Sequence, residues 1–281
     1  MARPHIEFLQ AQVLPWFTLP ATAARPGAEC KLLSRDADSG AASVILRYPA
    51  GFAIDRSHRL DSDEEFFVLK GEVSIGDTVY REGSYAFLPK DFPRGPMRVK
   101  DGADVLTFFP HKHDNHFDAG AGYDARKLVE HVDTKAVAWD MAGVDPKVVG
   151  SGLAKLILRL DPDTGERTWL LRMGASSPDL KEAPIESHPN VEEVLLLDGE
   201  ISTHLGVHKP GAYFWRPGNI PHGPVASARG MTGFFRCMGG PFSTNWSQHV
   251  EPIDWNHPYT PVLPPDLQKY KDAPVPAGQA Y

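Results

Sequence analysis

The sequence predicts an all-β protein in which two copies of one antiparallel β-sandwich or barrel follow each other along the chain. The first observation is a series of short segments rich in β-branched, aromatic and Leu residues, among them "SVILRYPAG", "TVYREGSYAFLP", "DVLTFFP" and "AKLILRLDPDTGERTWLLRMG". Gly, Pro, Asp and Asn turn signals separate these segments at spacings of roughly 8 to 12 residues, which is typical of sandwiches and barrels. Long helical periodicity is hard to find.

The second observation is an internal repeat. The segment "EEFFVLKGE" from Glu64 lies over "EEVLLLDGE" from Glu192, and "GSYAFLPKDFPRGP" from Gly83 lies over "GAYFWRPGNIPHGP" from Gly211, both at a shift of 128 residues without a gap. Further upstream, "KLLSRDADSG" resembles "KLILRLDPDTG" at a shift near 125. The chain therefore reads as two copies of one β domain.

The repeat sets the predicted domain boundaries. We expect an N-terminal barrel over residues 20–112 and a C-terminal barrel over residues 145–245, joined by the polar stretch that begins with "HKHDNHFDAGAGYD". Residues 246–281 are Pro-rich and lack apolar periodicity, so we expect an arm that lies on a neighbouring surface or is partly disordered. Because arms without their own core are commonly ordered by packing on a neighbour, we expect a homodimer.

The composition excludes several classes of protein. With 281 residues, 42% hydrophobic and 23% charged, the chain is long enough to bury a sizeable core. The net charge of −7 leaves no basic surplus for nucleic acid, and no apolar stretch of about 18 residues is present to span a membrane. We expect a cytoplasmic protein that acts on a small-molecule substrate. Cys30 and Cys237 have no CxxC spacing and are expected to be buried thiols.

The segment "PIESHPNVEEVLLLDGE", residues 184–200, places acidic residues and a histidine at the start of a strand. Residues two apart on a strand share a face, so Glu186 and His188 can both point into a barrel. Glu192 enters from the next extended segment. His222 follows about thirty residues later, after a turn that contains Gly and Pro, and must be carried by another strand.

Two imidazoles with one or two carboxylates fit a borderline divalent ion such as Fe(II), Mn(II), Zn(II) or Ni(II). We expect one such ion, bound by His188, Glu192 and His222, with Glu186 either as a fourth ligand or as the catalytic base. The competing interpretations are a structural role for the two histidines and a solvent-facing strand end for Glu186.

Other polar residues are predicted to lie at the surface. Glu65 and Glu193, the second residue of each Glu pair, should face outward by strand alternation. The cluster "HKHDNH", with His111, His113 and His116, has no carboxylate or Cys partner at a regular spacing. A polar loop is therefore favoured there over a second metal site.

These motifs resemble the cupin superfamily, whose pattern is His-x-His, three or four residues, Glu and a Gly seven further on, followed by a block of Gly, five residues, Pro, a short turn and His. One position departs from it, because Glu186 stands where the first His is expected. The resemblance implies two tandem cupin barrels, each a double-stranded β-helix or jelly roll. The matching residues of the second copy are His188, Glu192, Gly199, Gly211, Pro217, Gly218 and His222.

The first copy keeps the barrel pattern and loses the ligand set. Leu60 stands in the place of His188, and Arg94 stands in the place of His222. His58 aligns with Glu186. We expect the Arg94 guanidinium to pair with Glu64 in a metal-free, structural barrel, the alternative being a second site.

Within the superfamily, "PGAECKLLSRDADSGAASVILRYPAG" resembles the cupins related to zinc-binding anti-sigma factors and to acetylacetone- and dihydroxyacetophenone-cleaving dioxygenases. Our first hypothesis is a non-haem iron dioxygenase that cleaves a small diketone, hydroxyketone or phenolic compound, with Fe(II) as the leading metal. The expected pocket wall includes Phe214 or Trp215. The expected catalytic residues are Arg172, Arg236 and Glu186.

Two other functions remain open. A redox-neutral metal-dependent lyase, hydrolase or isomerase would use the ion to polarise a carbonyl, with Glu186 as general base if it is not a ligand. A non-catalytic metal or small-molecule sensor ranks third, because the sequence shows no appended helical domain and no DNA-binding helix pair.

Overall fold

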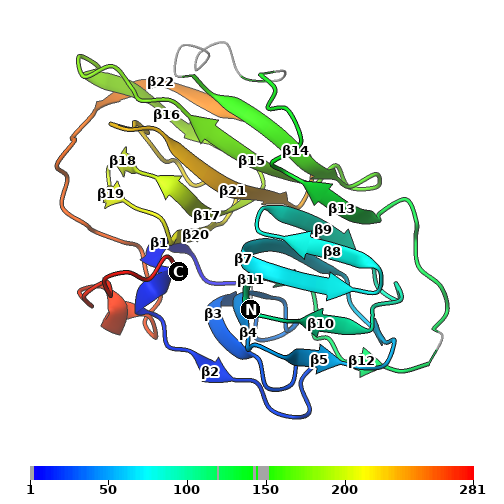
Figure 1. Cartoon of the computed structure of the whole chain (residues 1–281). Coiled ribbons are helices and arrows are strands. Elements are labelled where there is room, and N and C mark those ends of the chain that lie inside the picture. Colours follow the sequence, from blue (N-terminus) through cyan, green and yellow to red (C-terminus); the bar gives the residue numbers. More distant parts are fainter. Residues whose placement is uncertain (1–2, 119, 142–143, 145–151) are drawn as a thin grey trace. The chain divides into compact units, whose positions relative to one another are not determined.

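The structure is a computed structural model that describes residues 3–118, 120–141, 144 and 152–281, and it divides into two compact units (Figure 1). The first unit contains Arg3 and Leu14–Val137, and the second contains Pro4–Val13 together with Ala138–Tyr281. The segment Pro4–Val13 therefore belongs to the second unit although it precedes nearly all of the first in the chain. The predicted start of the second barrel, residue 145, lies outside the described residues.

The first unit is built around a ten-stranded sheet, with the order β13-β9-β7-β11-β4-β3-β2 and with β5, β8 and β10 attached beside this path. A short ribbon pairs β12 with β6. The strands are β2 (Phe17–Thr18), β3 (Glu29–Arg35), β4 (Ala42–Tyr48), β5 (Phe52–Ile54), β6 (Arg59–Leu60), β7 (Glu64–Ile75), β8 (Thr78–Arg81), β9 (Ser84–Leu88), β10 (Met97–Val99), β11 (Ala103–Phe109), β12 (Asn115–His116) and β13 (Val129–Asp133).

The second unit has a six-stranded sheet with the order β1-β20-β17-β21-β15-β14, and two ribbons that pair β16 with β22 and β18 with β19. Two short 3₁₀ turns are also present in its described residues. The elements are β1 (Ile6–Gln10), η1 (Ala11–Val13), β14 (Ala154–Leu160), β15 (Arg167–Met173), β16 (Glu182–Ser187), β17 (Val191–Gly199), β18 (Ile201–Thr203), β19 (Gly206–His208), β20 (Ala212–Arg216), β21 (Met231–Met238), β22 (Asn245–Pro252) and η3 (Gln268–Tyr270).

The two units repeat one strand order, as the 128-residue shift predicts. The order β9-β7-β11-β4-β3 of the first sheet recurs as β20-β17-β21-β15-β14 in the second. The backbone bridge between His58 and Arg94 likewise recurs between Glu186 and His222. The prediction of an all-β chain with two tandem barrels is confirmed. Each sheet also has an edge strand outside this common order: β13 lies beside β9, and β1 lies beside β20.

Apolar residues at every second position of the strands fill the interior of each barrel. In the second unit Val194 and Leu196 of β17 pack with Trp169, Phe214 and Phe235 in one cluster. A similar cluster in the first unit is formed by the inward residues of its own strands, for example Phe66 and Val68 of β7. Both cysteines are buried free thiols, as expected. Strand alternation therefore decides which side chains can reach each interior.

The expectation that Glu65 and Glu193 lie at the surface is wrong, because each is only 1% exposed. They do point away from the apolar cluster of their own barrel, but they are buried there among other side chains and hydrogen-bonded. The Tyr85 hydroxyl donates to Glu65 Oε1 at 2.6 Å, and the Tyr213 hydroxyl donates to Glu193 Oε1 at 2.6 Å. Arg236 also pairs with Glu193. The outward face of a strand is thus not always the solvent-facing one.

The C-terminal segment lies along the second unit. Its first part forms β22, which pairs with β16, so regular structure extends past the predicted barrel end at residue 245. Farther on, the Tyr259 hydroxyl donates to the Phe8 carbonyl at 2.8 Å, and the Glu7 amide donates to the Val262 carbonyl at 2.8 Å. The segment and β1 therefore stabilise each other. Among the described residues, no helix has the length and apolar character needed to cross a membrane.

Candidate metal centre

Two neighbouring segments bring the predicted ligands together. Glu186 is on β16, His188 follows one residue after the strand ends, and Glu192 is the second residue of β17. His222 lies in the connection after β20 and is joined to Glu186 by two backbone hydrogen bonds, Glu186 N to His222 O at 2.9 Å and the reverse at 2.8 Å. These bonds set the two side chains next to each other.

The side-chain atoms converge on one point. His222 Nε2 lies 3.6 Å from Glu186 Oε1 and 3.9 Å from Glu192 Oε2, and His188 Nε2 lies 3.8 Å from Glu192 Oε1. Ligand atoms of Glu186, His188 and His222 all fall within 4.8 Å of one another. Among the residues that the structure describes, no other group of His, Cys, Asp and Glu does so.

Both imidazoles are oriented for metal binding. His188 Nδ1 lies 3.0 Å from the Ser243 carbonyl, and His222 Nδ1 lies 3.0 Å from the Ile220 carbonyl. Since a carbonyl only accepts, each Nδ1 carries the proton and each Nε2 presents its lone pair to the site. A ligand histidine normally needs such an acceptor for its second ring nitrogen, and both histidines have one.

Burial sets the charges of the site. It lowers the pKa of His222 to about 4, with the Arg216 guanidinium adding to the effect, so this imidazole is neutral near pH 7. Burial is also the main cause that raises the pKa of Glu186 to about 7, and the nearby Glu192 carboxylate raises it further. A divalent cation between these groups would remove the repulsion between the two carboxylates. Two imidazoles that present Nε2 to the site, together with a carboxylate, fit a borderline divalent ion.

Glu192 has a second partner that the sequence did not reveal. Arg216, the last residue of β20, donates from Nη1 to Glu192 Oε2 at 2.7 Å. The same guanidinium donates from Nε to Glu7 Oε1 at 2.7 Å. Glu192 therefore has Oε1 directed at His188 while Oε2 is held by Arg216. One signal was present: Arg216 shares its strand parity with Phe214, so alternation places both on the inner face.

A pocket of about 470 Å³ opens beside the four candidate ligands, and its wall belongs to the second unit. Six aromatic side chains contribute to it, which makes most of the wall apolar. Lys155 lies in the wall with its ammonium 5.5 Å from the Phe242 ring centre. The aromatic residues are Phe8, Trp169, Phe214, Phe235, Phe242 and Trp246.

Two of the three predicted catalytic residues do not reach this pocket. Arg172 follows the pocket residue Leu171 on β15, so its exposed guanidinium faces away and lies 4.9 Å from the Trp139 ring centre. Arg236 follows Phe235 on β21 and is held by Glu193 at 2.6 Å on the opposite face. Strand alternation places both side chains on the face away from the pocket, which corrects their assignment as catalytic residues. Of the two predicted wall residues, Phe214 lines the pocket and Trp215 does not.

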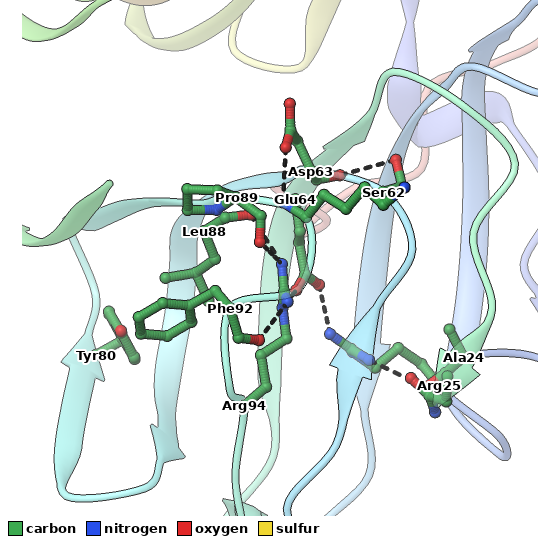
Figure 2. A network of polar contacts seen from close by, with 12 residues as sticks. Ala24, Arg25, Ser62, Asp63, Glu64, Tyr80, Leu88, Pro89, Phe92 and Arg94 are labelled. Carbon is green, nitrogen blue, oxygen red and sulfur yellow. Dashed lines mark hydrogen bonds and ion pairs between the residues drawn. The ribbon is translucent and has the colours of Figure 1, made fainter. Parts of the chain in front are cut away.

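The equivalent position in the first unit holds an ion-pair network. Glu64, only 3% exposed, accepts from Arg94 Nε at 3.0 Å through Oε2 and from Arg25 Nη2 at 2.6 Å through Oε1 (Figure 2). Arg94 also donates to the carbonyls of Leu88, Pro89 and Phe92. The predicted pairing of Arg94 with Glu64 is confirmed, and both carboxylate oxygens are taken by guanidinium groups.

The histidines of "HKHDNH" do not converge. The His113 ring stacks on Phe109 with 3.5 Å between ring centres, and His116 Nε2 lies 3.2 Å from Asp61 Oδ2. His111 is exposed. The cluster is thus dispersed over the end of the first barrel and is not a ligand group.

Comparisons with known proteins agree with this architecture. Among solved structures, a proposed dioxygenase of Nostoc punctiforme is 19% identical, with 89% of this chain and 90% of that chain covered and a TM-score of 0.77. The 7S globulin of Momordica charantia is 9% identical over 85% and 86% of the two chains, with a TM-score of 0.53. A variant of oxalate decarboxylase from Bacillus subtilis is 11% identical over 88% and 80%, with a TM-score of 0.52. At these identities the similarity shows the fold.

A search of curated proteins finds no match to the sequence. A family model described as the ChrR cupin-like domain matches twice, over residues 6–113 and 130–240. The two matches cover both barrels, and the second contains all four candidate ligands. The chain therefore belongs to the ChrR cupin-like family, as a two-barrel member with a group of candidate metal ligands in its second unit.

Proposed function

We propose that the second unit is the active site of a non-haem iron dioxygenase that cleaves a small oxygenated compound, such as a diketone, a hydroxyketone or a phenol. The observation that carries the proposal is the convergence of two histidines and one carboxylate, His188, His222 and Glu186, beside a pocket with aromatic walls. Two imidazoles and one carboxylate with open positions are the donor set typical of Fe(II) oxygenases. The Nostoc punctiforme neighbour, described as a proposed dioxygenase, is consistent with this chemistry.

The protein's own residues would contribute binding, orientation and water exclusion. A bound Fe(II) ion would supply the redox chemistry that dioxygen needs. Aromatic side chains such as Trp169 and Phe235 would hold the apolar body of the substrate and keep the site dry. Hydrogen bonds from His188 and His222 to backbone carbonyls fix both rings, so the ligand geometry is set before substrate arrives.

The test is oxygen consumption by protein loaded with Fe(II), with small diketones, hydroxyketones and phenols as candidate substrates. We expect uptake of one O₂ per substrate consumed, and loss of uptake in His222→Ala. Arg172→Ala is a matched control, because its guanidinium faces away from the pocket, and it should keep wild-type uptake. Substrate turnover without oxygen uptake would contradict the proposal.

A second candidate is a redox-neutral lyase, hydrolase or isomerase, and one distance favours it. Glu192 Oε1 lies 3.8 Å from His188 Nε2, so Glu192 can replace Glu186 as the carboxylate ligand. Glu186, whose side chain is 23% exposed beside His222, would then be free to act as general base. Turnover supported equally by Zn(II) in the absence of oxygen would identify this function, and Glu186→Gln would then abolish turnover while retaining the metal.

A further inference from the structure

The N-terminal strand β1 places two consecutive side chains toward the metal barrel. It pairs with β20 through Ile6 with Trp215 and Leu9 with Tyr213, and the register shifts between these pairs. Phe8 has a positive φ of 61° at this irregularity. Neighbouring residues of a regular strand face opposite sides, and a bulge removes that restriction. Phe8 therefore lines the pocket while the adjacent Glu7 reaches Arg216.

Glu7 and Arg216 form a buried chain of charges that ends at Glu192. Glu7 is 2% exposed and Arg216 is 4% exposed. Glu7 Oε1 lies 2.7 Å from Arg216 Nε and 2.8 Å from His5 Nε2, and Arg216 Nη1 lies 2.7 Å from Glu192 Oε2. One guanidinium thus lies between two carboxylates. Its face also lies 4.2 Å from the Phe214 ring centre, which restricts its position.

In its described residues, the first unit has no second carboxylate that shares the guanidinium groups with Glu64 in this way. Glu64, the counterpart of Glu192, is held by two guanidinium groups, one on each oxygen. No oxygen of Glu64 is left for an ion, and Arg94 fills the place of a ligand histidine. In the second unit only Oε2 of Glu192 is held, and the guanidinium that holds it is shared with Glu7.

We infer that Glu7 is a positioning residue of the metal centre: it orients and neutralises Arg216, so that Glu192 keeps Oε1 directed at His188 and the cation. Without the Glu7 carboxylate, an uncompensated guanidinium would lie next to the ion and would draw Glu192 toward itself. Both effects weaken cation binding, because like charges repel strongly in a buried site. The role requires a bound metal but no particular reaction.

The test is the metal affinity of Glu7→Gln, measured by Zn(II) competition with a chromophoric chelator. We expect an apparent Kd about tenfold weaker than wild type, as is typical when a group that holds a ligand is removed. The visible spectrum of the Co(II)-loaded protein should also shift, since the environment of Glu192 changes. Thermal unfolding of the apo proteins, measured alongside, shows that each variant is folded.

Glu193→Gln is a matched control. Glu193 is equally buried, is paired with Arg236 at 2.6 Å and is adjacent to Glu192, but lies on the opposite face of β17. It should bind Zn(II) within about twofold of wild type. In an Arg216→Gln background, Glu7→Gln should not weaken Zn(II) binding further, because the guanidinium through which Glu7 acts on Glu192 is already absent. Wild-type affinity in Glu7→Gln, equal losses in Glu193→Gln, or an undiminished loss in the Arg216→Gln background would each overturn the inference.

Discussion

Removal of the Arg94 guanidinium should destabilise the first unit without affecting the metal centre. In Arg94→Met, Glu64 loses its Oε2 partner and the carbonyls of Leu88, Pro89 and Phe92 lose buried donors. Breaking a buried ion pair costs about 3 to 5 kcal/mol. The Pro89 carbonyl keeps the Phe92 amide as a donor, each of the other two carbonyls adds about 1 kcal/mol, and the apolar packing of Met recovers part of the sum. The expected net loss is about 4 kcal/mol.

Hydrogen exchange is the suitable assay, because a protein with two units need not unfold in one step. Peptides from β7 and β9 should lose protection in Arg94→Met, whereas peptides from β17 and β20 should not. The metal content of the variant should equal that of wild type. A loss of less than about 1 kcal/mol in the first unit, or a loss of bound metal, would refute a structural role for this network.

Three further predictions concern charge, backbone and the first barrel. Burial raises the pKa of Glu186 to about 7, so protons compete with the metal below this pH. Calorimetry should show that metal affinity rises with pH up to about 7 and then levels off. The apo protein should lose stability as the pH rises toward 7, because Glu186 binds its proton more tightly in the folded state than in the unfolded state. Gly199→Ala should lower stability by more than about 2 kcal/mol in urea unfolding, since φ is 74° and the new Cβ would lie 2.0 Å from the Gly230 carbonyl oxygen. His58→Ala should leave the metal content unchanged by elemental analysis, and a loss of metal in this variant would show that an ion binds in the first unit.

The convergence of the candidate ligands in the second unit could be predicted from the sequence because their positions follow local rules. Glu186 and His188 are two residues apart on one extended segment, and the repeat fixes where His222 must return. The degenerate copy could be predicted for the same reason, since Arg94 occupies the place of His222. Spacing within a strand and between repeats is visible in a single sequence.

The partners of those ligands could not be predicted. Glu7 and Arg216 are separated by 209 residues, and no repeat or motif relates β1 to β20. The assignment of Arg172 and Arg236 failed for a different reason. Both lie on strands that line the pocket, but alternation places their side chains on the outer face. That face is fixed by cross-strand pairing, of Arg236 with Glu193 and of Arg172 with Thr232. Long-range pairing and face assignment are properties of the folded chain.

An anomalous diffraction map at the metal absorption edge, from protein purified without chelator, tests the metal centre most directly. We predict one peak in the second unit, within bonding distance of His188 Nε2, His222 Nε2 and a Glu186 oxygen, with Glu192 Oε1 turned toward it. Crystals of His222→Ala should lack the peak. A peak between His58 and Glu64, or one retained in full in His222→Ala, would contradict the assignment.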